Sequence, residues 1–404
     1  MNDRRMGPRA ILMSIGVSVA LATRCATDAG IAATKPELTQ RVVAARSGPE
    51  GRSVGIVLTG GGAFGAWEVG ALQAFFDAWR ERYGAEPPIR VIAGASTGAL
   101  IAPFLVFGQA GVSEVTDWYT RVRQSDIVAP KLGAILPLPL FAATTSSVYG
   151  VGFTGDVATG SSRLWGKLAT ALIPKLERIG AAWSAVPPLR LAIAALDFKR
   201  GAPRVFTNSP SDLRQLPYGI LASAMAPLAL PPIPISEVDG AAFSKNPHLD
   251  GSIYAVAPIG ELFDVAALPP QIGLTDLVII SAFPRFPGDD DKSVQPKPFP
   301  RNPSFTDVGD RMTVLLSEAS ASKEIALLRA ALALRAGGTS PAAVAGITGL
   351  RIPSEPPALC VLAPEHRLGS HVLRFQPKEM TTMYELGLGE GRGQLAPAGR
   401  CALN

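Results

Sequence analysis

The chain has 404 residues and a formal net charge of +5, with 47% hydrophobic and 18% charged residues. A chain of this size and apolarity can bury a sizeable core, and no internal stretch is long and apolar enough to predict a membrane-spanning helix. The basic residues are scattered without interleaved aromatic residues, which excludes nucleic acid as an expected partner. A mild attraction to anionic membrane surfaces is compatible with the charge, and no obligatory protein partner is inferred.

The N-terminus resembles an export signal. Arginines within the first nine residues precede an apolar run at 11–22 that is too short to span a membrane comfortably. Cys25 follows, as the lipidated cysteine does in bacterial lipoproteins, but Arg24 stands where such sites carry a small residue. Ordinary cleavage at 26–29 and a cytoplasmic chain with a frayed N-terminal helix are the alternatives. We expect export, either to the cell envelope (periplasmic or anchored through Cys25) or out of the cell.

Two glycine-framed turns follow predicted strands. A strand at 54–58 leads through Gly60-Gly61-Gly62-Ala63-Phe64-Gly65 into a predicted helix at 66–82. A second strand, at 89–93, leads through Gly94-Ala95-Ser96-Thr97-Gly98 into another helix, which is expected to end at 107. This repeat of strand, tight turn and helix is typical of a parallel α/β sheet.

The second turn has the G-x-S-x-G pattern of a nucleophile elbow. Glycines at 94 and 98 permit the sharp turn that exposes Ser96 at a helix N-terminus, where developing negative charge is favoured. The glycines of the first turn, Gly60, Gly61 and Gly62, can direct free backbone N–H groups to the same place, as an oxyanion hole requires. Together the turns indicate a serine nucleophile.

Two other interpretations of these turns are weaker. The first turn also fits a dinucleotide-binding G-x-G-x-x-G, but that motif expects an acidic residue at the end of the next strand, which closes on Gly94-Ala95-Ser96. Glycines that merely allow helices to pack on a sheet would explain Gly65 and Gly70. They would not explain a serine framed by two glycines.

The rest of the chain continues the alternation of strands and helices. Helices are expected at 112–124, 164–179, 218–225, 308–336 and 377–388, and strands at 189–196, 204–207, 276–282 and 360–363. The pattern predicts an α/β fold with a mainly parallel sheet in one domain. Residues 129–160 differ, because prolines in the apolar stretch 136–141 exclude a regular helix or central strand. This segment is either a lipid-contacting lid or a loop on the core.

A serine nucleophile needs a base within hydrogen-bonding reach. In the order serine, acid, histidine, Asp250 followed by His366 or His371 would fit a triad, although each of these histidines is more typical of a surface position. The other route is a dyad in which a carboxylate acts on the serine directly. Asp250 suits this role, because it ends a short extended stretch that begins at His248 and is followed by Gly251, which permits a sharp turn.

These blocks resemble those of the patatin-like phospholipases, a family of lipid acyl hydrolases. Residues 60–70 resemble the glycine-rich oxyanion block of the family, and 94–98 resemble its nucleophile elbow. Pro231-Pro232 followed by Asp250-Gly251-Ser252 resembles its D-G-G or D-G-A block. The likeness extends over about 53–284.

The resemblance implies a three-layer α/β/α fold in which Ser96 is the nucleophile and Asp250 its proton acceptor. It also implies that the N–H groups of Gly60, Gly61 and Gly62 stabilise the oxyanion, and that catalysis needs no histidine, metal or other cofactor. The implied substrate is a fatty-acyl ester of a lipid.

Three positions depart from the family pattern or compete with it. Phe64 stands where the family commonly has Arg or Lys, which favours neutral esters and makes Phe64 a candidate for lining the substrate site; the alternative is a core residue. Ser252 replaces the second glycine or alanine of the aspartate block. Asp239, in a second Asp-Gly pair, is a rival to Asp250.

Residues 1–29 are thus expected to be the export signal, 30–51 a linker and 52–400 a patatin-like hydrolase domain. The expected function is a serine acyl hydrolase with a Ser–Asp dyad. A Ser-Asp-His esterase and a catalytically degenerate lipid-binding envelope protein are the alternatives.

The cysteine and histidine residues do not have the spacing of a metal site, so no metal is expected. Outside the export signal the cysteines are Cys360 and Cys401. In an exported protein they can pair and hold down the C-terminal tail, or they can be two partly buried thiols.

Overall fold

The computed structural model describes residues 51–127, 161–226, 230, 232–239, 242–284, 305–369 and 372–401. The predicted export signal with Cys25, the candidate lid at 136–141 and His371 lie outside the described residues. None of the helices in the described ranges is long and apolar enough to cross a membrane.

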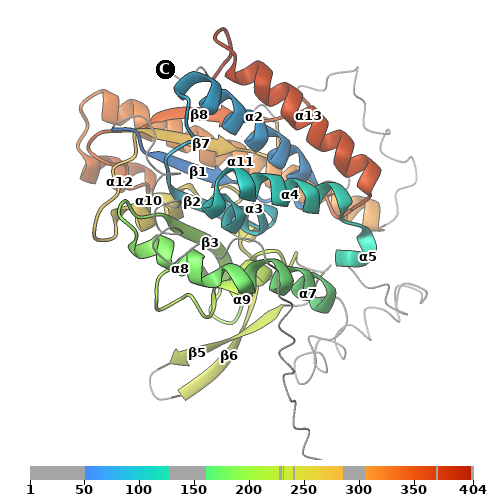
Figure 1. Cartoon of the computed structure of the whole chain (residues 1–404). Coiled ribbons are helices and arrows are strands. Elements are labelled where there is room, and N and C mark those ends of the chain that lie inside the picture. The colour runs from blue at the N-terminus through green and yellow to red at the C-terminus, as the bar shows by residue number, and fades with distance from the viewer. Residues whose placement is uncertain are drawn as a thin grey trace, which may run out of the picture.

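One sheet forms the centre of the fold. Its strands are β1 (Val54–Leu58), β2 (Ile89–Ala95), β3 (Arg190–Asp197), β4 (Ala202–Thr207), β5 (Ile233–Asp239), β6 (Ala242–Asp250), β7 (Asp276–Ile280) and β8 (Ala358–Leu362). Their order is β5-β6-β3-β2-β1-β7-β8, and β4 also pairs with β3. The neighbouring strands in the part of the sheet ordered β3-β2-β1-β7-β8 are parallel, whereas β4 and β6 lie antiparallel to β3. The mainly parallel sheet expected from the sequence is therefore confirmed, with the antiparallel hairpin β5–β6 at one edge (Figure 1).

Helices connect and cover these strands. They are α2 (Gly65–Tyr83), α3 (Thr97–Ile101), α4 (Gln109–Arg121), α5 (Gln124–Ile127), α7 (Ser161–Leu172), α8 (Leu176–Ser184), α9 (Leu216–Ser223), α10 (Ile259–Ala267), α11 (Phe305–Ala336), α12 (Pro341–Thr348) and α13 (Pro377–Leu395). Short 3₁₀ helices lie at Gly62–Phe64, Ala102–Phe107, Ile173–Lys175 and Gly251–Ile253.

The sheet is covered on both faces because its central strands are apolar on both sides. Ile56 and Leu58 of β1 pack in the cluster that includes α2, α3 and α4, whereas Val57 belongs to the opposite cluster with α10, α11 and α12. Helix α13 joins the first layer and lies alongside α2 (Figure 1). This is the three-layer α/β/α architecture expected from the sequence.

Prolines interrupt two of the expected helices. The helix expected at 164–179 is divided into α7 and α8 by a 3₁₀ turn that contains Pro174, which has no N–H to donate. The helix expected to end at 107 is α-helical only as far as Ile101 and continues as a 3₁₀ helix with Pro103 near its start.

Tertiary packing extends the last helix beyond its expected end near 388. Helix α13 continues to Leu395 although glycines disfavour helix in this part of the sequence. A Cβ at Gly391 would lie only 2.9 Å from the Cβ of Ala74 in α2, so a side chain there would obstruct the crossing of the two helices. The short helices α10 and α12 were not expected at all.

A disulfide joins the C-terminal tail to the edge of the sheet. Cys360 lies in β8 and Cys401 follows α13, with their Cα atoms 5.0 Å apart. Of the two states that the sequence left open, the structure therefore has the paired one. The bond closes a loop that contains all of α13, and it ties the residues that follow this helix to β8.

Breaking this disulfide should destabilise the fold. For the sequence separation of 41 residues, the loss of loop closure is worth about 3–4 kcal/mol. We expect Cys401→Ser to lower the midpoint of urea unfolding of the purified chain. Dithiothreitol should lower the midpoint of the wild type by the same amount, and it should not lower the midpoint of the variant further. Cys25→Ser, which leaves this bond intact, is the matched control. A wild-type midpoint insensitive to dithiothreitol would contradict this expectation.

Candidate active site

Ser96 occupies a strained turn directly after β2. Its backbone has φ 51° and ψ −119°, and among the described residues it is the one non-glycine position with positive φ. The flanking glycines are required by space: a Cβ at Gly98 would lie 2.5 Å from the carbonyl oxygen of Leu58, and one at Gly94 would lie 2.4 Å from that of Gly98. The elbow therefore has the geometry that the G-x-S-x-G pattern predicts, and it holds the serine hydroxyl at the start of α3.

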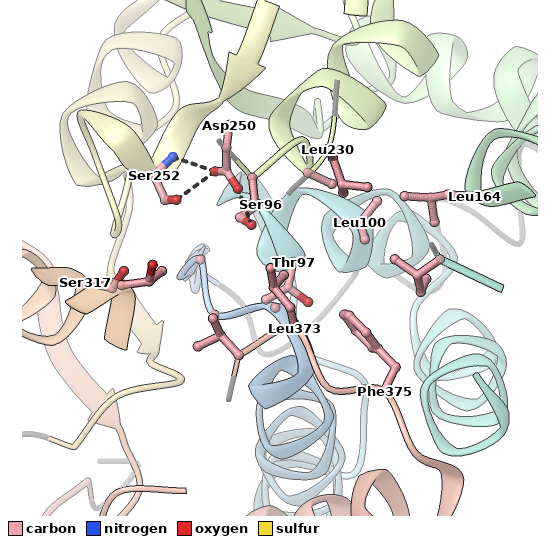
Figure 2. Close-up of a pocket in the computed structure, with 18 of the residues that line it drawn as sticks. Ser96, Thr97, Leu100, Leu164, Leu230, Asp250, Ser252, Ser317, Leu373 and Phe375 are labelled. Atoms are coloured by element: carbon pink, nitrogen blue, oxygen red, sulfur yellow. Dashed lines mark hydrogen bonds between the residues drawn. The ribbon is translucent and has the colours of Figure 1, made fainter. Parts of the chain in front are cut away.

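The sheet order brings Asp250 to this elbow. Strand β6 ends at Asp250, which lies opposite Ala195 of β3, and β3 in turn neighbours β2. The Ser96 hydroxyl donates to Oδ2 of Asp250 at 2.7 Å, and both side chains are buried (Figure 2). The serine and the aspartate that the sequence proposes as a dyad are therefore in direct contact.

Ser252 binds the other carboxylate oxygen of Asp250. Its backbone N–H and its hydroxyl donate to Oδ1 at 2.9 and 2.7 Å, respectively (Figure 2). The first bond caps the short 3₁₀ helix after β6, and the second exists only because this chain has a serine here. The carboxylate is thus fixed in orientation, with Oδ2 presented to Ser96.

Burial and hydrogen bonding act on the pKa of Asp250 in opposite directions. Loss of solvent raises the pKa to about 6, while the bonds from Ser96 and Ser252 lower it. Asp250 is consequently ionised at neutral pH and titrates within reach of it, which is the range in which a base can both accept and return a proton.

The first turn lies against the elbow, but its three N–H groups are not equivalent. A Cβ at Gly60 would lie 3.1 Å from the Cβ of Ser96, so the two turns touch. The N–H of Gly60, however, donates to the carbonyl of Val256 at 2.9 Å. It is not a free donor, and the expectation that all three glycines serve an oxyanion hole is wrong at this position. The N–H groups of Gly61 and Gly62 have no acceptor within the described parts of the chain.

A buried carboxyl group stabilises the start of the glycine turn by hydrogen bonds. Glu68 of α2 accepts hydrogen bonds from the backbone N–H and the hydroxyl of Thr59, at 3.0 and 2.9 Å. Complete burial raises the pKa of Glu68 to about 8, so the group is mostly neutral at pH 7. The carbonyl of Thr59 accepts from the N–H of Gly98 at 3.1 Å, which ties the glycine turn to the nucleophile elbow.

Phe64 lies behind the glycine turn. Its side chain is 3% exposed and packs with Val256, Ala282, Phe283 and Val372. Phe283 and Val372 belong to the pocket lining, and Phe64 does not. This differs from the expectation that Phe64 lines the substrate site, because the side chain points into a small core cluster instead.

The histidines within the described residues do not meet Ser96. His248 is buried on β6, where its Nδ1 lies 2.8 Å from the carbonyl oxygen of Asn246. Neither His248 nor His366 lines the pocket around the serine. His371 lies outside the described residues, so the triad alternative rests on this position.

The rival aspartate lies elsewhere. Asp239 ends β5 and pairs with Ala242, at the turn of the β5–β6 hairpin. This hairpin projects away from the layers of the fold (Figure 1). The other end of β6, at Asp250, is the end that reaches Ser96.

The pocket in front of Ser96 has two unlike sides. An apolar wall comes from α3, α4, α5, α7 and the segments before β5 and α13; its residues include Leu100, Trp118, Val122, Ile127, Leu164, Leu230 and Phe375. On the opposite side of Ser96, Ser317 of α11 lies near Ser252 (Figure 2). Thr313, one turn earlier in α11, also lines the pocket. The site can therefore hold an elongated apolar group on one side of the serine and a polar group on the other.

A family model described as patatin-like phospholipase matches residues 56–263. The match covers more than half of the 404 residues, and the chain belongs to the patatin-like phospholipase family. No curated protein sequence matches it significantly. The described residues contain no group of three or more His, Cys, Asp and Glu side chains placed to hold a metal ion.

Solved structures that match the chain include those of three proteins. VipD from Legionella pneumophila shares 13% identity with a TM-score of 0.37, and the match covers 85% of this chain and 66% of VipD. The type III effector protein ExoU shares 13% identity with a TM-score of 0.32, and the match covers 86% of this chain and 53% of ExoU. Human GIVD cytosolic phospholipase A2, in complex with methyl gamma-linolenyl fluorophosphonate and terbium chloride, shares 13% identity with a TM-score of 0.35. This match covers 84% of this chain and 57% of the phospholipase chain. The chain thus spans 53% to 66% of the length of these proteins.

The second hydrogen bond from Ser252 should be visible in the titration of Asp250. Ser252→Ala removes the hydroxyl that stabilises the ionised carboxylate, so the pKa of Asp250 should rise above its value of about 6, by about one unit. The measurement is a pH titration of the ¹³C-carboxyl signals of aspartate-labelled protein, with Asp250→Asn to assign the signal. Ser113→Ala, which removes an exposed hydroxyl from α4, should leave the midpoint unchanged; an unchanged midpoint in Ser252→Ala would contradict the role of Ser252.

Proposed function

We propose that the protein is a serine acyl hydrolase that cleaves fatty-acyl esters of lipids. Membership of the patatin-like phospholipase family supports lipid acyl hydrolysis as the class of reaction. The observation that carries the proposal is the 2.7 Å hydrogen bond between Ser96 and Asp250 at the bottom of a mainly apolar pocket. An ester with a long acyl chain fits such a site, because the chain can lie along the apolar wall while its carbonyl reaches the serine.

In the first half-reaction, Oγ of Ser96 attacks the ester carbonyl carbon and its proton passes to Oδ2 of Asp250. The negative charge that develops on the carbonyl oxygen is stabilised by the N–H groups of Gly61 and Gly62, which have no acceptor among the described residues. When the tetrahedral intermediate collapses, the C–O bond to the alcohol breaks. The alcohol leaves with the proton from Asp250, and the acyl group stays on Ser96.

In the second half-reaction, a water molecule donates a proton to Asp250 and attacks the acyl-serine carbonyl. The same N–H groups stabilise the second oxyanion. Collapse of this intermediate releases the fatty acid and returns the proton to Ser96. The polar side of the pocket, with Thr313 and Ser317, accommodates the leaving alcohol and then the water.

Two further assignments complete the proposal. A Ser-Asp-His mechanism would have to use His371, since the described histidines do not line the pocket. A binding protein without catalysis would not need a strained serine in contact with an ionisable carboxyl group, so we favour the enzyme. We also propose that the protein is exported, because a disulfide such as Cys360–Cys401 is typical of oxidising compartments.

Loss of the nucleophile tests the reaction. Ser96→Ala should lower kcat/KM for p-nitrophenyl octanoate by roughly 10³-fold or more, because no other group can form the acyl intermediate. Ser113→Ala is the matched control and should behave as wild type. His371→Ala should change kcat/KM by less than about fivefold, whereas a loss of about 10³-fold in a folded variant would replace the dyad by a triad. Wild-type turnover in Ser96→Ala would refute the assignment.

The pH dependence tests the base. Asp250 must be ionised to accept the proton from Ser96, and its pKa is about 6. Activity should therefore be present above this pH and should fall as pH drops through it, by about tenfold per unit in kcat/KM. A profile from pH 4.5 to 8.5 with the soluble ester measures this limb. A rate that stays flat down to pH 4.5 would show that Asp250 is not the base.

A further inference from the structure

Helix α11 carries an exposed apolar stripe in its N-terminal half. Val308, Met312, Leu315 and Leu316 are 37, 55, 40 and 65% exposed, respectively. Met312, Leu315 and Leu316 follow Val308 by 4, 7 and 8 residues, and this spacing places all four side chains on one face of the helix. Large apolar side chains gathered in this way are uncommon on a free protein surface and indicate an interaction site.

The same segment of α11 borders the pocket. Thr313 and Ser317, which directly follow Met312 and Leu316 in the helix, line the pocket that holds Ser96. Figure 2 shows Ser317 near Ser252. Val314 and Ala321 are buried in the small core cluster that also contains Phe64. The stripe therefore lies beside the pocket, on a helix that is firmly seated in the fold.

Charge is distributed unevenly around α11. In the part of the helix from 311 to its end, the acidic side chains are directed inward: Glu318 is buried and pairs with Arg367 at 2.6 and 2.9 Å, and Glu324 accepts the N–H groups of Val256 and Ala257. Lys323 is exposed and lies two turns from Leu316 on the same face. Between 311 and 336 the outward face thus presents apolar groups and a cation, with no exposed carboxylate.

We propose that the stripe of Val308, Met312, Leu315 and Leu316 is a docking surface for a lipid–water interface. The proposal rests on the acyl hydrolase function, because it places the pocket of Ser96 at the surface of the lipid that supplies its substrate. A face of apolar side chains with a nearby cation and, between 311 and 336, no exposed acid matches the interfacial region of a membrane that contains anionic lipids. Four side chains are too few for the ~800 Å² that each partner buries in a stable dimer.

Vesicle binding and hydrolysis test the docking surface together. Met312→Asp/Leu316→Asp in the full chain should weaken sedimentation with phosphatidylcholine–phosphatidylglycerol (7:3) vesicles by about tenfold or more, because two apolar groups can no longer enter the interface. Hydrolysis of lipid in these vesicles should fall with binding, while kcat/KM for soluble p-nitrophenyl butyrate stays within about twofold. The matched control is Ile347→Asp/Leu386→Asp, which changes two exposed apolar residues of α12 and α13.

A local probe makes the test independent of any other membrane contact. In a Cys25→Ser/Ser96→Ala chain, the NBD fluorophore attached at Leu316→Cys should brighten and shift to the blue on addition of vesicles, and at Leu386→Cys it should not. Unchanged emission at position 316 with vesicle binding intact would overturn the proposal. The proposal would also be overturned if the wild type were a dimer and Met312→Asp/Leu316→Asp a monomer, because the stripe would then bind a second copy of the chain.

Failure of the proposed reaction would look different. A wild type that hydrolyses neither vesicle lipid nor the soluble ester would refute the acyl hydrolase function. The fluorophore would still report whether α11 enters the interface.

Discussion

The hydrogen bond between Ser96 and Asp250 depends on almost every level of the fold. The serine comes from the end of β2 and the aspartate from the end of β6, and β3 lies between these strands. Only the observed order and register bring the two ends together, since a shift by one residue would turn Asp250 to the other face of the sheet. The antiparallel hairpin β5–β6 at the edge of a parallel sheet is thus the feature that brings Asp250, the proposed base, to Ser96.

Burial gives the two carboxyl groups of this region different tasks. Both Asp250 and Glu68 have a raised pKa because they lose solvent. Both oxygens of Asp250 accept hydrogen bonds, whereas Oε2 of Glu68 has no partner among the described residues, and Asp250 stays ionised near neutrality, at a pKa of about 6. Glu68, at about 8, is largely neutral at pH 7 and accepts bonds from Thr59 under the glycine turn. We therefore propose that Asp250 transfers the proton, while Glu68 holds the backbone turn that lies against Ser96.

Local sequence patterns were sufficient for the parallel core and the Ser96 elbow, because turns and apolar runs are determined by nearby residues. Asp250, which the family resemblance pairs with Ser96, is in contact with it. The local patterns failed where a distant residue decides the outcome. The N–H of Gly60 donates to the carbonyl of Val256, and Phe64 is buried in a core cluster with residues from four other segments. The sequence shows Ser252 only as a replacement for glycine or alanine, and the bond of its hydroxyl to Asp250 appears only once the turn after β6 is folded. Likewise, the small residues of α13 are explained only by the close packing of this helix against α2.

The central claim is that Ser96, the N–H groups of Gly61 and Gly62, and the apolar wall act on one ester. The most direct measurement is a crystal structure of the protein after reaction with a long-chain alkyl fluorophosphonate. The account predicts a phosphonyl group on Oγ of Ser96, its non-bridging oxygen within hydrogen-bonding distance of both N–H groups, and the alkyl chain between Leu100, Leu164 and Leu230. An adduct on another residue, or an alkyl chain that leaves along Thr313 and Ser317, would contradict it.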